Sequence, residues 1–485
     1  MPNLLINSGP GSGKSYTIAE AFLYYKATNK TLWLQQHRWT EEQLEIYEWI
    51  FNNIQLTNPE KTQCAYISYS TEVAERLSKK VHKNAQVKTC HGFGASIIIK
   101  NARWVKINHN RSITLVEQYT GKNYWRLPDR KQWQATIKHL ACLKEEMKEA
   151  TMNNIEYVHE KYPDLSKEEI HPRIIEQCLA LIPLMKQITD EGIEYIDQIW
   201  LANQYLKEPI FDLGFVDEAQ DLSIARLTLC NKLCKNLIYV LDPNQSIFGF
   251  SGADTQAYEK IKSICDKELF LKESFRNPPN IISRLNGMKP NARLRTKNTH
   301  SGEEKQLSYD EAIKKLEDSL SGLIICRYNS PLVSFALLLA QNKIKCKILG
   351  GKLADQLIFM IKGTKATDLT GLRQILMRDP GIKKASAAKV HTDKVQTILF
   401  CASTCSTIDE LINTIKTLIT KEPTAGIQLC SGHKSKGLEH PNVYILNPPI
   451  ISEYAESREE ILQEENLDYV VLSRTQRNIY YVIPN

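Results

Sequence analysis

The chain has 485 residues, a hydrophobic content of 42%, a charged content of 24% and a formal net charge of +7. These values are ordinary for a soluble globular protein of two or three domains, and the mildly basic balance permits contact with phosphate polymers without requiring it. Twelve cysteines include no CxxC pair, which excludes the usual zinc frameworks and indicates reduced thiols in a cytoplasmic protein. The sequence shows neither a signal peptide nor an apolar run near the roughly 20 residues of a membrane helix.

The first predicted element is a short buried strand over residues 4–7, followed by a glycine-rich loop and an apolar helical pattern. The loop reads Ser8-Gly9-Pro10-Gly11-Ser12-Gly13-Lys14-Ser15. A strand, a glycine loop and a helix N-terminus form an anion site in which backbone N–H groups surround phosphates. Lys14 can supply a positive charge to the terminal phosphates, and the Ser15 hydroxyl can ligate magnesium. The loop therefore predicts a protein that binds and hydrolyses a nucleoside triphosphate, although its first position is Ser8 where the strict pattern has glycine.

More than 100 residues separate Phe93 from the next strand-like run at Phe211, too many for a loop. Helical patterns over Trp133–Glu149 and Ile174–Ile188 predict a helical insert. The stretch from Trp104 to Trp133 mixes aromatic and basic residues and could hold duplex or single-stranded DNA. The alternative, which we favour slightly, is a solvated charged face over a small aromatic core.

A predicted strand over Phe211–Val216 runs directly into two adjacent carboxylates, Asp217 and Glu218. Asp217 can hold magnesium through water, and Glu218 can orient and deprotonate the attacking water. A solvated acidic turn is the alternative, but the apolar strand and the phosphate loop weigh against it. The two motifs together predict a P-loop triphosphatase that uses ATP and Mg²⁺.

Seven further segments stand in a fixed order along the chain. They are residues 67–71 (ISYST), 89–93 (TCHGF), 217–221 (DEAQD), 242–253 (DPNQSIFGFSGA), 271–276 (LKESFR), 433–439 (HKSKGLE) and 469–475 (YVVLSRT). In this order they resemble the motifs of superfamily 1 DNA helicases of the UvrD, Rep and PcrA type. The resemblance extends over nearly the whole chain, and the agreement of all seven segments makes it specific.

The resemblance implies an α/β fold with two RecA-like parallel-sheet domains of the P-loop type and one ATP between them. Arg276 and Arg474 match arginines that reach the γ-phosphate, a task for which the planar guanidinium is suited. Gln245 matches a glutamine that senses the same phosphate. With Lys14 and Glu218, these three residues form the expected catalytic set.

The resemblance also implies contacts to the rest of the nucleotide. Phe275 matches a tyrosine that stacks on the base, and Glu439 matches a residue that contacts the ribose. Gly437 lies in the same segment as Glu439, and Tyr16 directly follows the phosphate loop. We expect all four residues to contribute to nucleotide binding.

A motor that moves on any sequence should hold the DNA backbone and the faces of the bases. Several residues match family positions on the single-strand path, and ordinary core or cleft packing remains the alternative for the aromatic ones and for the histidine of TCHGF. The expected nucleic-acid contacts are Tyr69, Thr89, His91, Phe248, Phe250 and His433.

The motifs divide the chain into four predicted parts. The first RecA-like domain takes residues 1–97 and 206–267, with a helical accessory insert at 98–205. The second takes residues 268–351 and 426–485, with a reduced, short insert at 352–425. Residues 193–197 (IEYID) resemble the IDFDDL segment with which the family's chain returns to its first domain.

One departure concerns the glutamine that reads adenine, which the family places upstream of the phosphate loop. Here residues 39–43 (WTEEQ), about 25 residues after the loop, resemble that motif. One hypothesis is that the segment folds back so that Gln43 reaches the adenine. The other, which we favour, is a helix start in which Thr40 and Gln43 form a capping box.

Three further departures each remove a positive charge. Tyr16 and Ser251 stand where the family has arginine, and Glu72 stands where it has lysine. We therefore expect weaker affinity for nucleotide or DNA than in a typical relative.

The sequence thus predicts an ATP-dependent DNA helicase or translocase that moves 3′ to 5′ on single-stranded DNA, with single strands and strand junctions as partners. Three alternatives remain: a translocase that displaces proteins with little unwinding, an RNA-directed helicase, and a pseudo-helicase that serves as a binding subunit. The TCHGF segment disfavours the second, and the intact catalytic set disfavours the third. The compact form would suit a phage or mobile-element protein.

Overall fold

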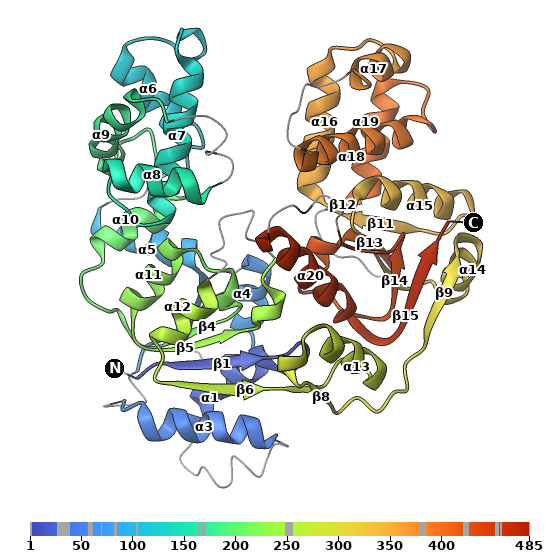
Figure 1. Ribbon diagram of the computed structural model, residues 1–485, viewed down its shortest axis with the longest axis horizontal. Coiled ribbons are helices and arrows are strands. Elements are labelled where there is room, and N and C mark those ends of the chain that lie inside the picture. Colours follow the sequence, from blue (N-terminus) through green and yellow to red (C-terminus); the bar gives the residue numbers. More distant parts are fainter. Residues whose placement is uncertain are drawn as a thin grey trace. The chain divides into compact units, whose positions relative to one another are not determined.

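The computed structural model of the chain contains two compact units, each with its own parallel sheet (Figure 1). The first unit takes in Met1–Ser8, Gly13–Pro243 and Phe248–Leu271, and the second takes in Gly9–Ser12, Asn244–Ile247 and Lys272–Asn485. The structure describes residues 2–26, 39–56, 62–68, 70–81, 85–102, 105–162, 165, 170–247, 256–378, 385–420, 426–451, 455 and 458–484.

The sheet of the first unit has the strand order β3-β2-β4-β5-β1-β6, and all its pairs are parallel. The strands are β1 (Leu4–Ser8), β2 (Cys64–Ser68), β3 (Ala85–Thr89), β4 (Phe211–Val216), β5 (Cys234–Leu241) and β6 (Lys267–Leu271). Strand β1 is apolar and almost fully buried because it lies inside the sheet, between β5 and β6. The phosphate loop therefore starts from a rigid element.

Helices cover both faces of this sheet. They are α1 (Lys14–Lys26), α3 (Glu41–Asn53), α4 (Thr71–Ser78), α5 (Cys90–Asn101), α10 (Asp197–Tyr205), α11 (Ile224–Leu233) and α12 (Ala257–Ser263). On one face Ile6 and Tyr66 pack with Phe22 of α1 and Tyr47 of α3. Leu5 points to the other face and packs with residues of α5, α10 and α11. This alternation follows from the two-residue period of a strand.

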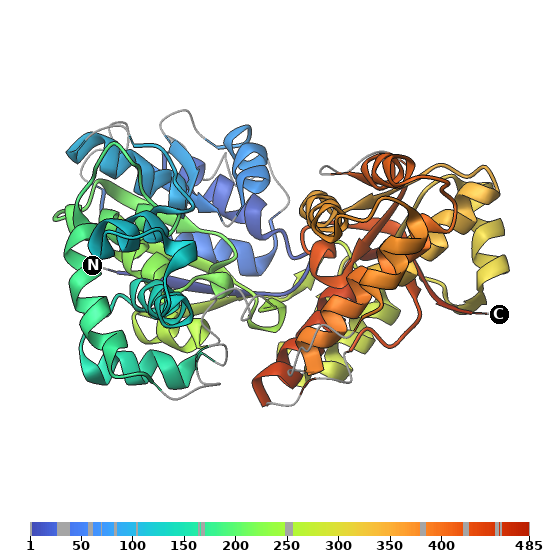
Figure 2. The same cartoon turned by 90° about the horizontal axis from the view of Figure 1, so that it is seen from above.

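Between α5 and α10 the chain forms a helical insert, whose helices gather into one bundle (Figure 1, Figure 2). They are α6 (Arg111–Thr120), α7 (Arg130–Glu145), α8 (Met152–Lys161) and α9 (Arg173–Lys186). Trp133, Leu140 and Leu181 lie in its hydrophobic core, and a backbone bridge between Ile107 and Ile193 joins its two ends.

The predicted helix over Trp133–Glu149 is α7, which ends earlier, at Glu145. Met147 adopts a positive φ of 53°, which a continuing helix does not allow, and Thr151 then caps α8. The end of α7 in the prediction was therefore wrong, because its apolar period runs on into the turn.

The second unit contains a sheet with the order β12-β11-β13-β10-β14-β15-β9, again with parallel pairs throughout. Its strands are β9 (Glu304–Ser308), β10 (Gly322–Cys326), β11 (Cys346–Leu349), β12 (Ile419–Thr420), β13 (Ile427–Ser431), β14 (His440–Leu446) and β15 (Thr475–Ile483). A separate parallel pair joins β7 (Glu273–Ser274) to β8 (Arg295–Thr296).

The helices of the second unit include a group that follows β11 and lies together in the ribbon views (Figure 1, Figure 2). This group is α16 (Gly351–Thr364), α17 (Leu369–Leu376), α18 (Ala385–Ala402) and α19 (Ile408–Leu418). The others are α13 (Pro279–Met288), α14 (Tyr309–Ser319), α15 (Asn329–Gln341) and α20 (Arg458–Leu472).

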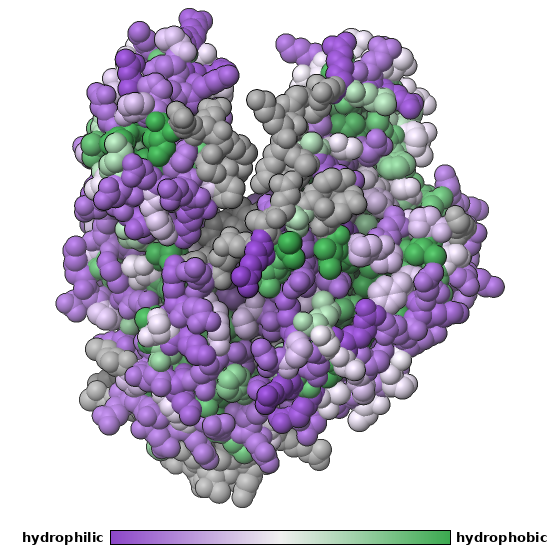
Figure 3. Space-filling view, in the orientation of Figure 1, coloured by the Kyte–Doolittle hydropathy of each residue, from purple (hydrophilic) through white to green (hydrophobic). Residues whose placement is uncertain are grey.

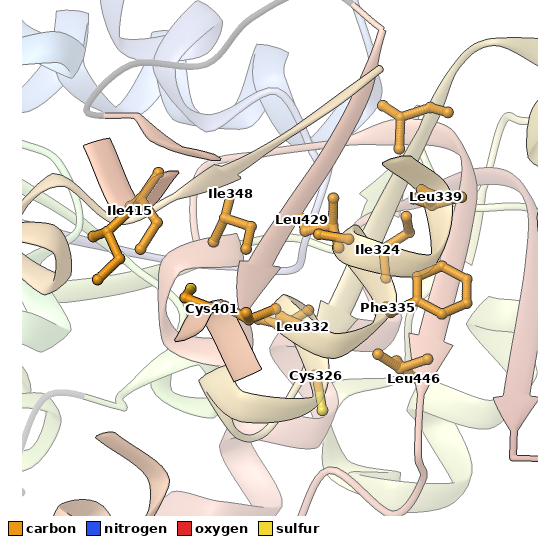
Figure 4. Packing of buried hydrophobic residues seen from close by; sticks show 14 of the residues in the cluster. Ile324, Cys326, Leu332, Phe335, Leu339, Ile348, Cys401, Ile415, Leu429 and Leu446 are labelled. Atoms are coloured by element: carbon orange, nitrogen blue, oxygen red, sulfur yellow. The ribbon is translucent and has the colours of Figure 1, made fainter. Parts of the chain in front are cut away.

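The group α16–α19 shares one hydrophobic core with the second sheet (Figure 4). Ile324 of β10 and Leu429 of β13 pack with Phe335 of α15, and Cys401 and Ile415 of the helix group join them. The group is therefore anchored to the sheet by apolar packing.

The predicted fold class is confirmed, since each unit has the parallel sheet and covering helices of a RecA-like α/β domain. The face visible in Figure 3 is mostly hydrophilic, with apolar residues in small groups. Within the described ranges, no helix is long and apolar enough to cross a membrane.

Candidate nucleotide site and nucleic-acid contacts

The phosphate loop joins the end of β1 to the start of α1, as the sequence predicts. Gly13 has φ +79°, a conformation that favours glycine, and its carbonyl accepts a hydrogen bond from Thr17 Oγ1 at 3.1 Å. The Ser8 hydroxyl donates to the carbonyl of Leu241 in the adjacent strand β5 at 2.8 Å. Serine at this first position is therefore accommodated, because its one polar group is bonded within the sheet.

The two residues expected to hold magnesium lie together in the first unit. Ser15 Oγ donates a 2.9 Å hydrogen bond to Asp217 Oδ2, although 202 residues separate them in the chain. A hydroxyl and a carboxylate are oxygen donors of the kind that Mg²⁺ prefers, so this pair fits the ion. Burial raises the pKa of the Asp217 carboxyl to about 6, and the neighbouring Glu218 adds to the rise, whereas Lys14 and Ser15 oppose it.

The raised pKa predicts that Mg²⁺ binding weakens as the pH falls through about 6. Protons and Mg²⁺ compete for the Asp217 carboxylate, and below this pH the protonated form prevails. A titration of Mg²⁺ in the presence of ATP at several pH values between 5 and 8 would measure the effect. If the affinity for Mg²⁺ stays constant across this range, Asp217 does not bind the ion.

The raised pKa of Asp217 also predicts how the stability of the folded protein depends on pH. Folding raises the pKa of Asp217 from its ordinary 3.8 to about 6. The contribution of this carboxyl to the free energy of unfolding is therefore favourable below pH 3.8 and is lost as the pH rises through 6. At pH 7 Asp217→Asn should therefore raise the Tm of the nucleotide-free protein by a few degrees. The variant should gain little further stability from Mg·ATP, unlike the wild type.

Glu218 is held in a strained and specific position beside Asp217. Its backbone has φ +54°, which is rare for a residue with a side chain, and such strain gathers at functional sites. Gln220 Nε2 donates to Glu218 Oε2 at 2.5 Å, and Gln220 Oε1 in turn accepts from the Asp242 backbone N–H at 3.1 Å. The carboxylate that we expect to act on water is thus oriented by a neighbour that is itself fixed.

The structure shows which contacts the Gln43 side chain makes. Thr40 and Gln43 form the predicted capping box at the start of α3. Gln43 Nε2 also donates to Thr17 Oγ1 at 3.0 Å, and the side chain is only 3% exposed. The capping-box interpretation is confirmed, and both ends of the amide are engaged inside the protein.

Two of the expected γ-phosphate residues lie together in the second unit. Arg474 is 2% exposed, and its Nη2 donates to Gln245 Oε1 at 3.2 Å. Its Nε donates to the Val470 carbonyl at 2.8 Å, and Lys436 Nζ donates to the Gln245 carbonyl at 2.8 Å. The arginine and the glutamine are therefore positioned as one hydrogen-bonded group.

The third expected γ-phosphate residue, Arg276, lies in the same unit and forms an ion pair with Glu439. The backbone N–H of its neighbour Phe275 donates to the Gly11 carbonyl at 2.9 Å, and the Phe275 ring is 49% exposed. A side chain at residue 11 would meet the Arg276 Cβ at 2.5 Å, so only glycine permits this approach. Phe275, Glu439 and Arg276, which are predicted to contact the base, the ribose and the γ-phosphate, are thus adjacent. Gly437, which has φ +85°, lies two positions before Glu439.

A pocket of about 480 Å³ lies beside Phe275 and Arg276 in the second unit. Sequence reasoning missed most of its lining, since it belongs to the loop after β8 and to the start of β15. These further lining residues are Lys297, Asn298, Thr299, His300, Gln476 and Arg477. The pocket is rich in cationic groups.

His91, one of the expected nucleic-acid contacts, stacks on Tyr195 with ring centroids 3.8 Å apart and planes at 15°. Burial, together with the nearby positive charge of Arg226, lowers the pKa of His91 to about 3, so the ring is neutral at physiological pH. Thr89 caps α5 by accepting from the Gly92 N–H at 3.1 Å. Neither residue offers a positive charge to a phosphate.

Tyr195 was not among the predicted site residues, although its segment resembles IDFDDL. Its ring is 53% exposed and rests on His91. Nearby, the fully buried Asp197 accepts hydrogen bonds from Arg111 Nη1 at 3.0 Å and from Lys144 Nζ at 2.7 Å. This ion cluster fixes the segment that carries Tyr195, because a buried charge network tolerates little movement.

A second aromatic position that the sequence analysis missed follows β10. The Tyr328 ring lies 5.4 Å from the Arg327 guanidinium carbon and 5.1 Å from Lys389 Nζ of α18. Arg327 is held by a two-point contact with Glu464, at 2.9 and 2.6 Å.

Of the other expected nucleic-acid contacts, only His433 lies within the described residues. Tyr69, Phe248 and Phe250 lie outside the described residues, as do Trp104 and Ser251. His433 is described, and burial lowers its pKa to about 4, with Arg327 contributing. It is therefore neutral at physiological pH.

Comparison with known proteins finds a family model that matches part of the chain. Residues 61–266 match the family model of the UvrD/REP helicase N-terminal domain. The chain is 34% identical over 79 residues to the RecBCD enzyme subunit RecB of Buchnera aphidicola, a match that covers 16% of this chain and 7% of that protein. It is 25% identical over 298 residues to the mitochondrial ATP-dependent DNA helicase HMI1 of Saccharomyces cerevisiae, covering 57% of this chain and 36% of the helicase.

The chain thus matches well under two thirds of the length of either relative. The matched domain contains Asp217 and Glu218, and the phosphate loop lies before it in the sequence. Together with the distant similarity to a DNA helicase, the domain match supports a relation of the chain to UvrD/Rep-type helicases of superfamily 1.

Proposed function

We propose that the protein is an ATP-dependent DNA helicase or translocase that moves on single-stranded DNA in the 3′ to 5′ direction. The observation that carries the proposal is the joint position of Ser15, Asp217 and Glu218 beside the phosphate loop. This arrangement supplies a metal-binding pair and a base for the attacking water, which is what hydrolysis of a triphosphate requires. ATP and Mg²⁺ are the cofactors that these residues fit.

The proposed catalytic roles extend to the second unit. Lys14 neutralises charge on the terminal phosphates, and Gln245 with Arg474 and Arg276 acts on the γ-phosphate. The hydrogen bond between Gln245 and Arg474 supports a shared role for these two residues. Phe275 and Glu439 hold the base and the ribose in the same proposal.

In the proposed DNA track, aromatic rings that stack on bases contribute more contacts than charged groups do. His91 and Tyr195 provide a stacked pair with one exposed ring, and Tyr328 provides a ring flanked by two cations. Aromatic faces accept any base, and arginine or lysine accepts any phosphate, so the contacts suit a motor without sequence preference.

A translocase that displaces proteins with little unwinding is the second candidate. The short second insert that we predict at residues 352–425 supports it, and the helices α16–α19 of the described residues lie in this part of the chain. The size of this insert is less than half of what the family resemblance leads us to expect.

Two assays test the proposal. ATP hydrolysis should rise when single-stranded DNA is added, and a fluorescent duplex with a 3′ tail should be separated faster than one with a 5′ tail. A DNA-stimulated ATPase that removes a bound protein but separates neither duplex would support the second candidate. An ATPase that ignores DNA would contradict both.

Tyr195→Ala should weaken binding of single-stranded DNA about tenfold, because one base–aromatic stack contributes roughly 1–3 kcal/mol. Fluorescence anisotropy with a labelled oligothymidylate would measure it. Tyr157→Ala is the matched control, since Tyr157 is also an exposed tyrosine, 38% accessible, but lies on α8. Equal affinities for the two variants would remove Tyr195 from the track.

A further inference from the structure

The second insert meets the proposed DNA track at the turn between β10 and α15. This turn carries Tyr328, and two residues of α18, Lys389 and Asp393, contact its ring or the residues that follow it. We infer that the second insert is a fixed part of the DNA track, in which Asp393 positions Tyr328 and Lys389 binds the phosphate backbone of the single strand. The inference rests on the proposed function, because it concerns the same track.

The first turn of α15 is capped by a carboxylate from another helix. Its N-cap residue is Tyr328, and tyrosine is not among the residues that cap helices, so the first N–H groups need another acceptor. Asp393 Oδ2 accepts from the Asn329 backbone N–H at 3.0 Å and from Asn329 Nδ2 at 2.9 Å, and Asp393 Oδ1 accepts from the Ser330 N–H at 2.8 Å. The positive end of the helix dipole also favours a carboxylate at this place.

These contacts fix the chain on both sides of Tyr328. On one side Arg327 is held by Glu464 of α20, and on the other side Asn329 is held by Asp393. Asp393 is only 7% exposed, and hydrogen bonds that are shielded from water are stronger than exposed ones. The position of the Tyr328 ring therefore depends on α18 as well as on α20.

The helix that carries Asp393 cannot leave the second sheet without exposing apolar surface. Ile398 and Cys401 of α18 are fully buried, and they lie in the same core as Leu332 of α15 (Figure 4). Separating α18 from α15 would bring these side chains into water and break the hydrogen bonds of Asp393 at the same time, and both changes are unfavourable. The insert therefore moves together with the second sheet.

Lys389 lies one helical turn before Asp393, and residues four positions apart share one face of a helix. Its Nζ lies 5.1 Å from the centre of the Tyr328 ring. Proteins that hold single strands combine aromatic rings, which stack on bases, with cations that follow the phosphates. A lysine beside such a ring is placed to bind the backbone of the stacked nucleotide. This contact comes from the insert rather than from the sheet.

Binding of a labelled oligothymidylate to the full chain, measured by fluorescence anisotropy at several salt concentrations, tests the role of Lys389. Lys389→Ala should weaken binding and reduce the slope of log Kd against log salt by about 0.7, the value for one phosphate contact on a single strand. Lys416→Ala removes an exposed lysine of α19 in the same insert, and it should change neither quantity. A wild-type slope in Lys389→Ala would overturn the phosphate contact.

The role of Asp393 is tested in the same assay. Asp393→Ala should weaken binding about tenfold, as Tyr328→Ala should, because the base stack is lost in both. Asp393→Asn keeps one acceptor oxygen and should lose less. The double variant Asp393→Ala/Tyr328→Ala should bind no more weakly than Tyr328→Ala alone, since Asp393 acts through the ring. Losses that add up would overturn the positioning role.

Asp368→Ala is the matched control for Asp393→Ala. Asp368 caps α17 in the same insert by accepting from the Gly371 N–H at 2.8 Å, and its loss should leave DNA binding unchanged. The Tm of each variant shows whether it is folded, and if Asp393→Ala does not fold, Asp393→Asn and Lys389→Ala still decide the question. Folded variants of Tyr328, Lys389 and Asp393 that bind DNA like the wild type would overturn the inference alone. A wild type that binds no single-stranded DNA would instead overturn the proposed function.

Discussion

Replacing Arg276 with alanine is expected to lower the kcat of ATP hydrolysis by about 10³–10⁵-fold while ATP still binds. Charge builds up on the γ-phosphate in the transition state, and a guanidinium stabilises that charge more than it stabilises the bound substrate. Arg276 is suited to this task because its buried Nε has no hydrogen-bond partner in the described part of the chain. Its ion pair with Glu439 holds the rest of the group in place.

Arg276 is a better test than Arg474, which is also expected to act on the γ-phosphate. Arg474 is 2% exposed and donates hydrogen bonds to the Val470 and Leu438 carbonyls, Gln245 Oε1 and Ser473 Oγ, so its removal would also disturb folding. The Arg276 side chain is 20% exposed. Arg276→Lys should recover only part of the rate, because lysine keeps the charge but lacks the planar fork.

Arg284→Ala is the matched control for Arg276. Arg284 lies on α13 in the same unit and forms an ion pair with Glu304, a surface contact like that of Arg276 with Glu439. Its loss should leave kcat within about twofold. Single-turnover hydrolysis, with ATP binding measured separately, gives both quantities. If Arg276→Ala hydrolyses ATP as fast as Arg284→Ala, the role of Arg276 at the phosphate is refuted.

The sequence predicted those parts of the site that depend on local pattern. The strand, glycine loop and helix around Lys14 follow one another within a few residues, so their order alone indicates a phosphate site. Asp217 and Glu218 could be predicted because an apolar strand runs straight into them. In both places the physical cause is contained in a short stretch of chain.

Other features depend on contacts that no local pattern contains. Residues 39–43 fit two hypotheses in the sequence, of which the capping box is favoured, and only the hydrogen bond from Gln43 to Thr17 of α1 shows where the side chain lies. Tyr195 could be assigned to a segment, but its exposure and its stack on His91 arise when α5 meets a residue more than 100 positions later. The raised pKa of Asp217 likewise requires the burial that packing of the sheet produces.

Glu218→Gln is expected to lower kcat by about 10²–10⁴-fold, the usual contribution of a general base. The amide keeps the size of the side chain and can still accept a hydrogen bond from Gln220 Nε2, which donates to Glu218 Oε2 in the wild type. What it cannot do is take a proton from water. ATP affinity should therefore change little, and the loss should appear in the chemical step.

Glu208→Gln makes the same chemical change at an exposed residue that precedes β4, and it should leave kcat unchanged. The same two variants also distinguish a loss of catalysis from a loss of stability caused by the strained backbone at Glu218. The φ of +54° at Glu218 is a property of the backbone, so glutamine there should fold with nearly the wild-type Tm. A low rate with a normal Tm identifies Glu218 as the base, because the fold is intact and only proton transfer is missing. A rate equal to that of Glu208→Gln would mean that another group activates the water.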